Sequence, residues 1–180
     1  KYVLITGGAG YIGSYVCKIF YDEGLIPVTF DNLLLGNKWS VKWGPLEIGD
    51  LCNEKDIQNT FEKYSFEGVI HLAALSNVRE SVENPSLYYK NNLIGSYNLL
   101  EKMVEFNVKN IVFSSTAAVY GNPTNLPINE SHSTIPINPY GDSKLAIEKL
   151  IRNYSFSYDL NFITLRYFNV SGSDILSQIG

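Results

Sequence analysis

Cysteines, long apolar runs and targeting signals are scarce in this sequence. Only two cysteines, Cys17 and Cys52, occur in 180 residues; they are too few for a disulfide framework and lack the spacing of metal ligands. No apolar run reaches the roughly 18 residues that a membrane span needs. The apolar start breaks into glycines instead of a signal-peptide cleavage site. We therefore expect a cytoplasmic protein with no metal site and no membrane partner.

Basic residues are also in short supply. Lys and Arg number 14 against 18 Asp and Glu, so the net charge is −4, and no basic block is present to bind a nucleic-acid backbone. Hydrophobic residues make up 45% of the chain and charged residues 18%, which is typical of a globular protein. We expect one domain with its own core and no nucleic-acid partner.

Strand-like and helix-like segments alternate along the whole chain. Strands are predicted at residues 2–6, 26–30, 46–48, 68–74, 110–115 and 162–166. Helices are predicted from the end of the first glycine-rich loop to about residue 23, and at 53–64, 85–106 and 140–157. This alternation is typical of a doubly wound α/β fold, in which helices cover both faces of a mostly parallel sheet.

A glycine motif, Gly7-x-x-Gly10-x-x-Gly13, joins the first strand to the first helix. In this setting the first glycine permits a tight turn, the second lets a pyrophosphate approach the backbone, and the third allows close packing. The helix start at Tyr11 and Ile12 then presents free N–H groups to the phosphates. The motif by itself is equally compatible with a tight turn that binds nothing.

Asp31 favours the dinucleotide interpretation, and Asn32 follows it. Asp31 ends the second predicted strand, near the offset of about 20 residues at which a ribose-binding acid is expected. A carboxylate there accepts a hydrogen bond from the ribose 2′-OH and repels a 2′-phosphate, so NAD is favoured over NADP. The alternative is a turn formed by an Asp-Asn pair after a strand.

Tyr140 and Lys144 form a Tyr-x-x-x-Lys pair at the start of a helix, one turn apart on the same face. Thr116 follows the fifth strand, at the sheet edge where such folds bind ligands. These residues suit hydride chemistry at a carbinol carbon, with Tyr140 as the base. That role needs a tyrosine pKa roughly 3 units below its usual value, or about 4 kcal/mol. The lysine ammonium and the positive nicotinamide ring together can supply it.

The glycine spacing resembles that of the extended short-chain dehydrogenase/reductases, over residues 2–180. The strings SSTAAVYG (114–121), NPYGDSK (138–144) and LRYFNVSG (165–172) resemble the UDP-glucose 4-epimerases among them. This resemblance implies an NAD-binding Rossmann domain that acts on a nucleotide sugar, and the epimerase strings imply a UDP-linked one. In such a reaction Tyr140 takes the proton of the sugar 4-OH while NAD accepts the C4 hydride. The 4-keto sugar then turns over, and the hydride returns to its opposite face.

The resemblance also assigns roles to single residues. Asp50 and Leu51 would lie against adenine, and residues 72–76 would line the nicotinamide-side ribose and phosphate. Thr116, Tyr140 and Asn169 would contact the substrate. With the motifs, it implies a cofactor set of Gly7, Gly10, Tyr11, Ile12, Gly13, Asp31, Asn32, Asp50, Leu51, Leu72, Ala73, Ala74, Asn91, Ser114, Tyr140, Lys144 and Phe168.

Ala117 and Ala118 separate epimerases from the related 4,6-dehydratases. Those enzymes carry an acidic pair directly after the catalytic threonine, and two methyl groups cannot donate or accept a proton. Dehydration is therefore disfavoured. Another nucleotide-sugar dehydratase, decarboxylase or reductase remains an alternative, as does a non-catalytic NAD-binding module, although the latter has no need of Thr116, Tyr140 and Lys144.

Five further residues receive individual interpretations. Ser76 stands where many epimerases have a lysine, so no charge contact is assigned there. Arg79 suits a phosphate contact and an exposed salt bridge equally well. His71 is predicted to be a hydrogen-bonded core histidine, Cys17 a helix-packing residue, and Cys52 is given no role.

The resemblance also bears on domain organisation and assembly. Family members of this kind continue into a smaller C-terminal part that grips the nucleotide sugar. We therefore expect residues 1–180 to be the NAD-binding part, with the substrate-binding part outside them and with weak or absent turnover in isolation. The resemblance also implies a homodimer formed through the helix that starts at Pro85 and the helix of Tyr140.

Overall fold

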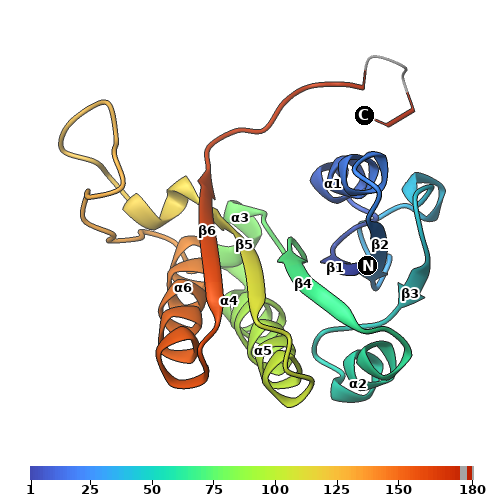
Figure 1. Ribbon diagram of the computed structural model, residues 1–180. Coiled ribbons are helices and arrows are strands. Elements are labelled where there is room, and N and C mark those ends of the chain that lie inside the picture. The colour runs from blue at the N-terminus through green and yellow to red at the C-terminus, as the bar shows by residue number, and fades with distance from the viewer. Residues whose placement is uncertain (175–177, 180) are drawn as a thin grey trace.

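The computed structural model describes residues 1–174, 178 and 179. Its centre is a six-stranded sheet with the order β3-β2-β1-β4-β5-β6 (Figure 1). All neighbouring strands run parallel. The strands are β1 (Tyr2–Thr6), β2 (Ile26–Asp31), β3 (Leu46–Ile48), β4 (Phe66–His71), β5 (Asn110–Thr116) and β6 (Asn161–Tyr167). The predicted parallel α/β sheet is confirmed.

Helices connect these strands on both faces of the sheet (Figure 1). The helical elements are α1 (Tyr11–Asp22), α2 (Glu54–Lys63), α3 (Val78–Glu83), α4 (Pro85–Tyr88), α5 (Gly95–Glu105) and α6 (Pro139–Tyr158), with the 3-10 turns η1 (Lys38–Ser40) and η3 (Ala117–Tyr120) and the π-helical η2 (Tyr89–Ile94). No helix within the described residues is long and apolar enough to cross a membrane.

Alternate residues of β1 contribute to two cores. Leu4 belongs to the larger core, which includes Ile57 of α2, Leu99 of α5 and Ile147 of α6. Val3 and Ile5 point to the opposite face, where they pack with Cys17 of α1. Since side chains alternate between the faces of a strand, this division shows that α1 covers one face, while α2, α5 and α6 cover the other.

Three features differ from the sequence-based expectations. β4 ends at His71 rather than Ala74, because the N–H groups of Leu72 and Ala73 turn toward the side-chain oxygen of Thr6. The long helix from Pro85 contains η2 between α4 and α5. The short elements α3, η1 and η3 were not predicted, because pieces of three to six residues have little hydrophobic periodicity.

The chain order creates a switch point at the middle of the sheet. After β1 the chain moves outward through β2 to β3, and then returns to place β4 on the other side of β1. The connections that leave the carboxyl ends of β1 and β4 therefore diverge. Open α/β sheets bind their ligands in the crevice that this divergence leaves.

Candidate active site

A cavity of about 350 Å³ lies at this switch point. It is formed by the glycine loop after β1, by the segments after β2, β3 and β4, and by one residue of β5. Of the predicted cofactor residues, the lining includes Gly7, Gly10, Tyr11, Ile12, Gly13, Asp31, Asn32, Asp50, Leu51, Leu72, Ala73, Ala74, Asn91 and Ser114. The structure thus brings together in one cavity residues that the sequence spreads over more than a hundred positions.

The three motif glycines face different surroundings. Gly7 has φ +72°, and a Cβ there would lie 2.8 Å from the backbone nitrogen of Ala73. A Cβ on Gly13 would lie 2.1 Å from the carbonyl oxygen of Gly7, so this third glycine packs on the loop itself. A Cβ on Gly10 would meet only that same oxygen, at 3.3 Å. The fold therefore requires Gly7 and Gly13, whereas Gly10 chiefly keeps the cavity open.

Asp31 is buried at the end of β2, with 8% of its surface exposed. One carboxylate oxygen accepts a hydrogen bond from the N–H of Ala9 at 3.1 Å, and the other accepts from the N–H of Leu33 at 2.9 Å. The hydrogen bond from Leu33 closes an Asx turn, which is the alternative interpretation that the sequence left open. Each oxygen keeps a further acceptor site, so the turn and a hydrogen bond to a ligand hydroxyl are compatible.

The predicted catalytic side chains come from β5 and α6. Thr116 is the last residue of β5, and its hydroxyl accepts a hydrogen bond from the N–H of Ala118. The side chain of Asn138 caps α6 by accepting from the N–H of Gly141 at 2.8 Å. This cap fixes the start of α6, so that Tyr140 lies in its first turn and Lys144 one turn later.

Lys144 is almost fully buried and attached to β5. Its exposure is 2%, and its Nζ donates to the carbonyl oxygen of Ser114 at 2.8 Å. The same Nζ lies 4.9 Å from the centre of the Phe113 ring. Burial lowers the pKa of Lys144 to about 7, because removal from water penalises the ammonium form. Burial therefore makes this amine easier to deprotonate than that of an exposed lysine.

The pKa of Tyr140 differs from the sequence-based expectation. Burial raises the pKa of its phenol above the usual value, and the neighbouring Thr116 hydroxyl acts in the opposite direction. Lys144 is not among the groups that shift this pKa, and its Nζ donates to the Ser114 carbonyl. The expected lowering relied on Lys144 together with the positive nicotinamide ring. Positive charge added beside the phenol is what its role as a base would require.

Several lining residues were missed by sequence reasoning. Leu34 and Leu35 are 70% and 72% exposed although apolar. An apolar run directly after the Asp-Asn pair was the available signal for a flat apolar ligand surface. The lining residues that the sequence did not indicate as cofactor contacts are Phe30, Leu34, Leu35, Gly36 and Gly49, whereas residues 72–76 all line the cavity as expected.

Asn92 was also missed, and it holds the loop after β4 in place. Its side-chain oxygen accepts from the N–H of Leu75 at 2.9 Å, and its amide donates to the carbonyl oxygen of Leu75 at 3.0 Å. The same amide donates to the hydroxyl of Ser143, next to Lys144, at 3.3 Å. No pattern in the sequence could distinguish Asn92 from the neighbouring Asn91, because its partners are remote in the chain.

Five predicted contacts are absent from the lining of the main cavity, namely Thr116, Tyr140, Lys144, Phe168 and Asn169. Phe168 is 65% exposed and lines a second cavity, of about 380 Å³, between β6 and α6. Asn169 is exposed and lines neither cavity. Arg79 forms an exposed salt bridge with Glu83, the second of its two interpretations. Among the described residues, no group of three or more His, Cys, Asp or Glu side chains is placed to hold a metal ion.

The expectations for His71 and Cys17 are confirmed. His71 is buried, with one ring nitrogen 2.7 Å from the Thr6 hydroxyl and the other 2.8 Å from the Ser96 hydroxyl. Cys17 is buried between α1 and the sheet, and burial raises the pKa of its thiol to about 11. Neither side chain lines the main cavity.

Comparisons with known proteins agree with this geometry. The model of the family described as "NAD dependent epimerase/dehydratase family" matches residues 3–178. A UDP-glucose 4-epimerase of Halalkalibacterium halodurans is 46% identical over 99% of this chain and 53% of its own length. The human UDP-glucose 4-epimerase is 42% identical over 99% of this chain and 56% of its own length.

Solved structures give the same result. A crystal structure of UDP-glucose 4-epimerase from Brucella ovis in complex with NAD matches with a TM-score of 0.98 and 43% identity, over 100% of this chain and 55% of that chain. The present chain thus spans about half the length of the relatives that it matches. Together these matches confirm the family that the glycine spacing and the strings at residues 114–121, 138–144 and 165–172 predicted. The chain belongs to the NAD-dependent epimerase/dehydratase family.

Proposed function

We propose that the protein carrying this chain is an NAD-dependent epimerase that inverts C4 of a UDP-linked sugar through a 4-keto intermediate. The observation that carries the proposal is that the cavity lined by Gly10 and Asp31 reaches Ser114 of β5. The carbonyl of Ser114 accepts from Lys144, while Thr116 ends the same strand and Tyr140 lies one turn before Lys144 on α6. Relatives named UDP-glucose 4-epimerase, at 40–46% identity over nearly the whole chain, support the choice of substrate class.

The lining residues fit NAD. Gly10 leaves open a place that a side chain would fill beside the N-terminus of α1, where a pyrophosphate is favoured. Asp31 offers a buried carboxylate for a ribose hydroxyl and would repel a 2′-phosphate. When bound, NAD accepts a hydride from a carbinol carbon and later returns it. This chemistry needs a base at the hydroxyl that loses its proton.

The chain's own residues supply that base. Tyr140 takes the proton from the sugar 4-OH and gives it back when the opposite face of the 4-keto sugar is reduced. Thr116 hydrogen-bonds the same sugar oxygen and keeps it within reach of the phenol. Lys144 in its ammonium form and the positive nicotinamide ring of bound NAD would together favour the phenolate over the phenol. The net change in redox state is zero.

Ala117 and Ala118 make a dehydratase the weaker candidate. Both residues belong to η3, directly after Thr116. Elimination of water across two carbons requires a proton donor and an acceptor, which methyl groups cannot supply. Epimerisation requires only the one base described above.

We also propose a cytoplasmic homodimer, with no nucleic-acid or membrane partner. Support for the location comes from two cysteines that are both free thiols. Support for the dimer comes from exposed apolar residues on the helical run from Pro85, namely Leu87, Ile94 and Tyr97, at 38%, 48% and 42% exposure. Light scattering of the purified protein measures its mass directly; a monomeric mass at micromolar concentration would remove the dimer from the proposal.

Thermal melting with ligands tests the proposed function. A ligand at 100 times its dissociation constant adds about 2.7 kcal/mol to the stability, so we expect NAD to raise the Tm clearly. NADP should raise it far less, because Asp31 repels the 2′-phosphate. UDP-glucose added to the NAD complex should raise it further. Equal stabilisation by NAD and NADP, or no stabilisation by either, would contradict the proposal.

A further inference from the structure

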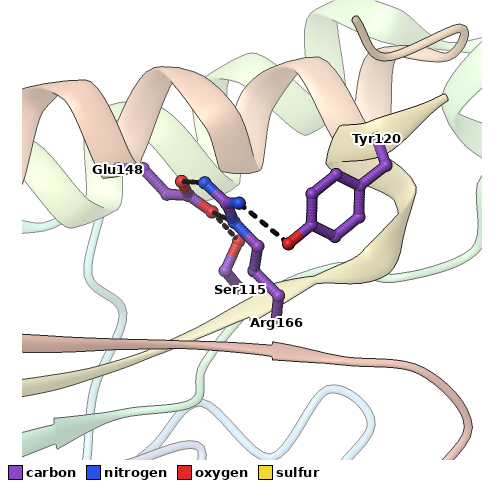
Figure 2. A network of polar contacts seen from close by, with 4 residues as sticks. All are labelled: Ser115, Tyr120, Glu148 and Arg166. Carbon is purple, nitrogen blue, oxygen red and sulfur yellow. Dashed lines mark hydrogen bonds and ion pairs between the residues drawn. The ribbon is translucent and has the colours of Figure 1, made fainter. Parts of the chain in front are cut away.

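Four side chains outside the main cavity form a connected polar network between β5, β6 and α6 (Figure 2). Glu148 of α6 lies at its centre and is 4% exposed. Its Oε1 accepts from the Ser115 hydroxyl at 2.5 Å and from Nε of Arg166 at 3.0 Å. Its Oε2 accepts from Nη2 of Arg166 at 2.7 Å. The remaining guanidinium nitrogen, Nη1, donates to the Tyr120 hydroxyl at 2.9 Å.

The network joins β5 and α6, which carry the proposed catalytic residues, to β6, which ends two residues before Asn169. Ser115 precedes Thr116 on β5, and Arg166 pairs with Ser115 across the β5–β6 ladder. Arg166 is followed by Phe168 and Asn169. Tyr120 closes η3, the turn that begins after Thr116, and its ring lies 4.9 Å from the guanidinium carbon.

Glu148 also lies one helical turn after Lys144 on α6, so the two side chains share a face of that helix. Lys144 donates to the carbonyl of Ser114, and Glu148 accepts from the hydroxyl of Ser115. Two successive turns of α6 are thus attached to two successive residues of β5. This double attachment opposes both sliding and rotation of α6 relative to the end of β5.

The chemistry of the network points to alignment rather than to ligand binding. None of its four residues lines the cavity proposed for NAD. Tyr120, Glu148 and Arg166 line the second cavity, but both Glu148 oxygens are already engaged by Ser115 and Arg166. A buried ion pair costs desolvation energy and stabilises a fold no better than apolar residues of the same size. A bidentate Arg–carboxylate pair does, however, fix the distance and orientation of the two side chains relative to each other.

We propose that Glu148 and Arg166 are positioning residues, whose ion pair sets Tyr140 and Lys144 of α6 against Thr116 of β5. The inference rests on the proposed function. A base displaced by about 1 Å costs on the order of 100-fold in turnover. Loss of the pair should therefore lower kcat far more than it changes KM or NAD binding.

The test uses Glu148→Gln in the complete natural polypeptide, because glutamine keeps the shape and removes the charge. We expect kcat for UDP-sugar interconversion to fall by about 10- to 100-fold, with KM and the NAD dissociation constant within about twofold of the wild type. Arg166→Lys keeps the positive charge but cannot form the bidentate hydrogen bonds of a guanidinium. We expect its kcat to lie between those of the wild type and Glu148→Gln. Tyr120→Phe keeps the ion pair and should retain most of the activity.

Two matched controls separate positioning from loss of stability. Glu83→Gln removes an exposed ion pair and should leave kcat unchanged. Ile57→Val trims a fully buried core residue of α2, and it should retain kcat even where its Tm falls as far as that of Glu148→Gln. The proposal is overturned if Glu148→Gln keeps the wild-type kcat, or if its NAD binding falls in proportion to kcat.

Amide hydrogen exchange provides a readout that needs no activity. We expect Glu148→Gln to increase exchange in residues 114–120 while residues 2–13 exchange as in the wild type. Unchanged exchange in residues 114–120 would overturn the alignment role. If the wild type fails to interconvert UDP-sugars, the proposed function fails, and the network is then judged by this exchange pattern alone.

Discussion

At the scale of single residues, the fold buries Asp31, His71, Lys144 and Glu148, and each has polar partners. Asp31 accepts from two backbone N–H groups, Lys144 donates to a backbone carbonyl, and His71 lies between two hydroxyls. Burial without partners would cost several kcal/mol for each group. The partners keep these side chains in defined positions, and in the cases of His71 and Lys144 burial also shifts the pKa.

His71 makes the stability of the protein depend on pH. Burial lowers its pKa to about 3 in the folded state, against about 6.5 for an unfolded histidine. The unfolded chain therefore binds one more proton between these values. The contribution of His71 is fully present above pH 6.5 and is lost as the pH falls toward 3. We expect the free energy of unfolding to fall from pH 6.5 to 5, with a slope of up to about 1.4 kcal/mol per pH unit.

Urea unfolding at several pH values measures this slope, and His71→Gln should flatten it. The matched control is His132→Gln, since these are the two histidines of the chain and His132 is not buried. If His71→Gln does not fold, a proton NMR titration of the wild-type His71 ring should show no protonation down to pH 5. A ring that titrates near 6.5, or a slope that His132→Gln abolishes, would contradict the assignment.

At the scale of elements, the glycine loop and the start of α1 must both pack closely on each other and leave room for a ligand. Gly13 is demanded by contact with the loop backbone, whereas Gly10 meets little of the protein. We expect Gly13→Ala to destabilise the protein without ligand by about 1–3 kcal/mol, as overpacking does. Gly10→Ala should leave that stability nearly unchanged and weaken NAD binding at least about 10-fold, because the new methyl group lies where the pyrophosphate must approach.

The two variants serve as controls for each other. Denaturant unfolding without ligand gives the stability, and titration with NAD gives the affinity. If Gly10→Ala binds NAD with wild-type affinity, the pyrophosphate does not lie beside Gly10 as proposed. An unchanged unfolding midpoint in Gly13→Ala would mean that the loop relaxes around the added methyl group.

Most elements could be predicted from the sequence because they have local causes. Apolar runs indicate the buried strands, and Asn53 and Asn138 cap the helices that follow them. The glycine motif indicates a turn between a strand and a helix. The π-helical η2 could not be predicted. Its buried residue Asn92 is held by Leu75 and Ser143, and partners so remote in sequence leave no local pattern.

The same distinction applies to the site. Asp31, the glycines and the residues after β4 line the cavity as the motifs predicted. The pKa direction of Tyr140 and the network around Glu148 depend on burial and on contacts between separate elements. A sequence motif indicates which functional residues are present, whereas the pKa values of these residues and their relative positions depend on burial and on packing between elements.

At the scale of the whole molecule, the strand order determines where chemistry can occur. Reversal of the order at β1 and β4 opens the cavity, and the next strand, β5, brings Ser114 to its wall and Thr116 to the adjoining edge. α6 then returns over β5 with Tyr140 and Lys144. The topology thus places the cavity proposed for NAD at the same edge of the sheet as the proposed base, Tyr140. This arrangement supports the proposal of a single reaction site rather than separate binding and catalytic regions.

The most direct test of this account follows a deuterium label at C4 of UDP-glucose, in ordinary water, with the complete natural polypeptide. The account predicts conversion to UDP-galactose with the label retained at C4, because the hydride that leaves the sugar is the one that returns. Tyr140→Phe should bind NAD as the wild type does and convert the sugar about 100- to 10,000-fold more slowly. Conversion with loss of the label to solvent, or no conversion by the wild type, would contradict the central claim.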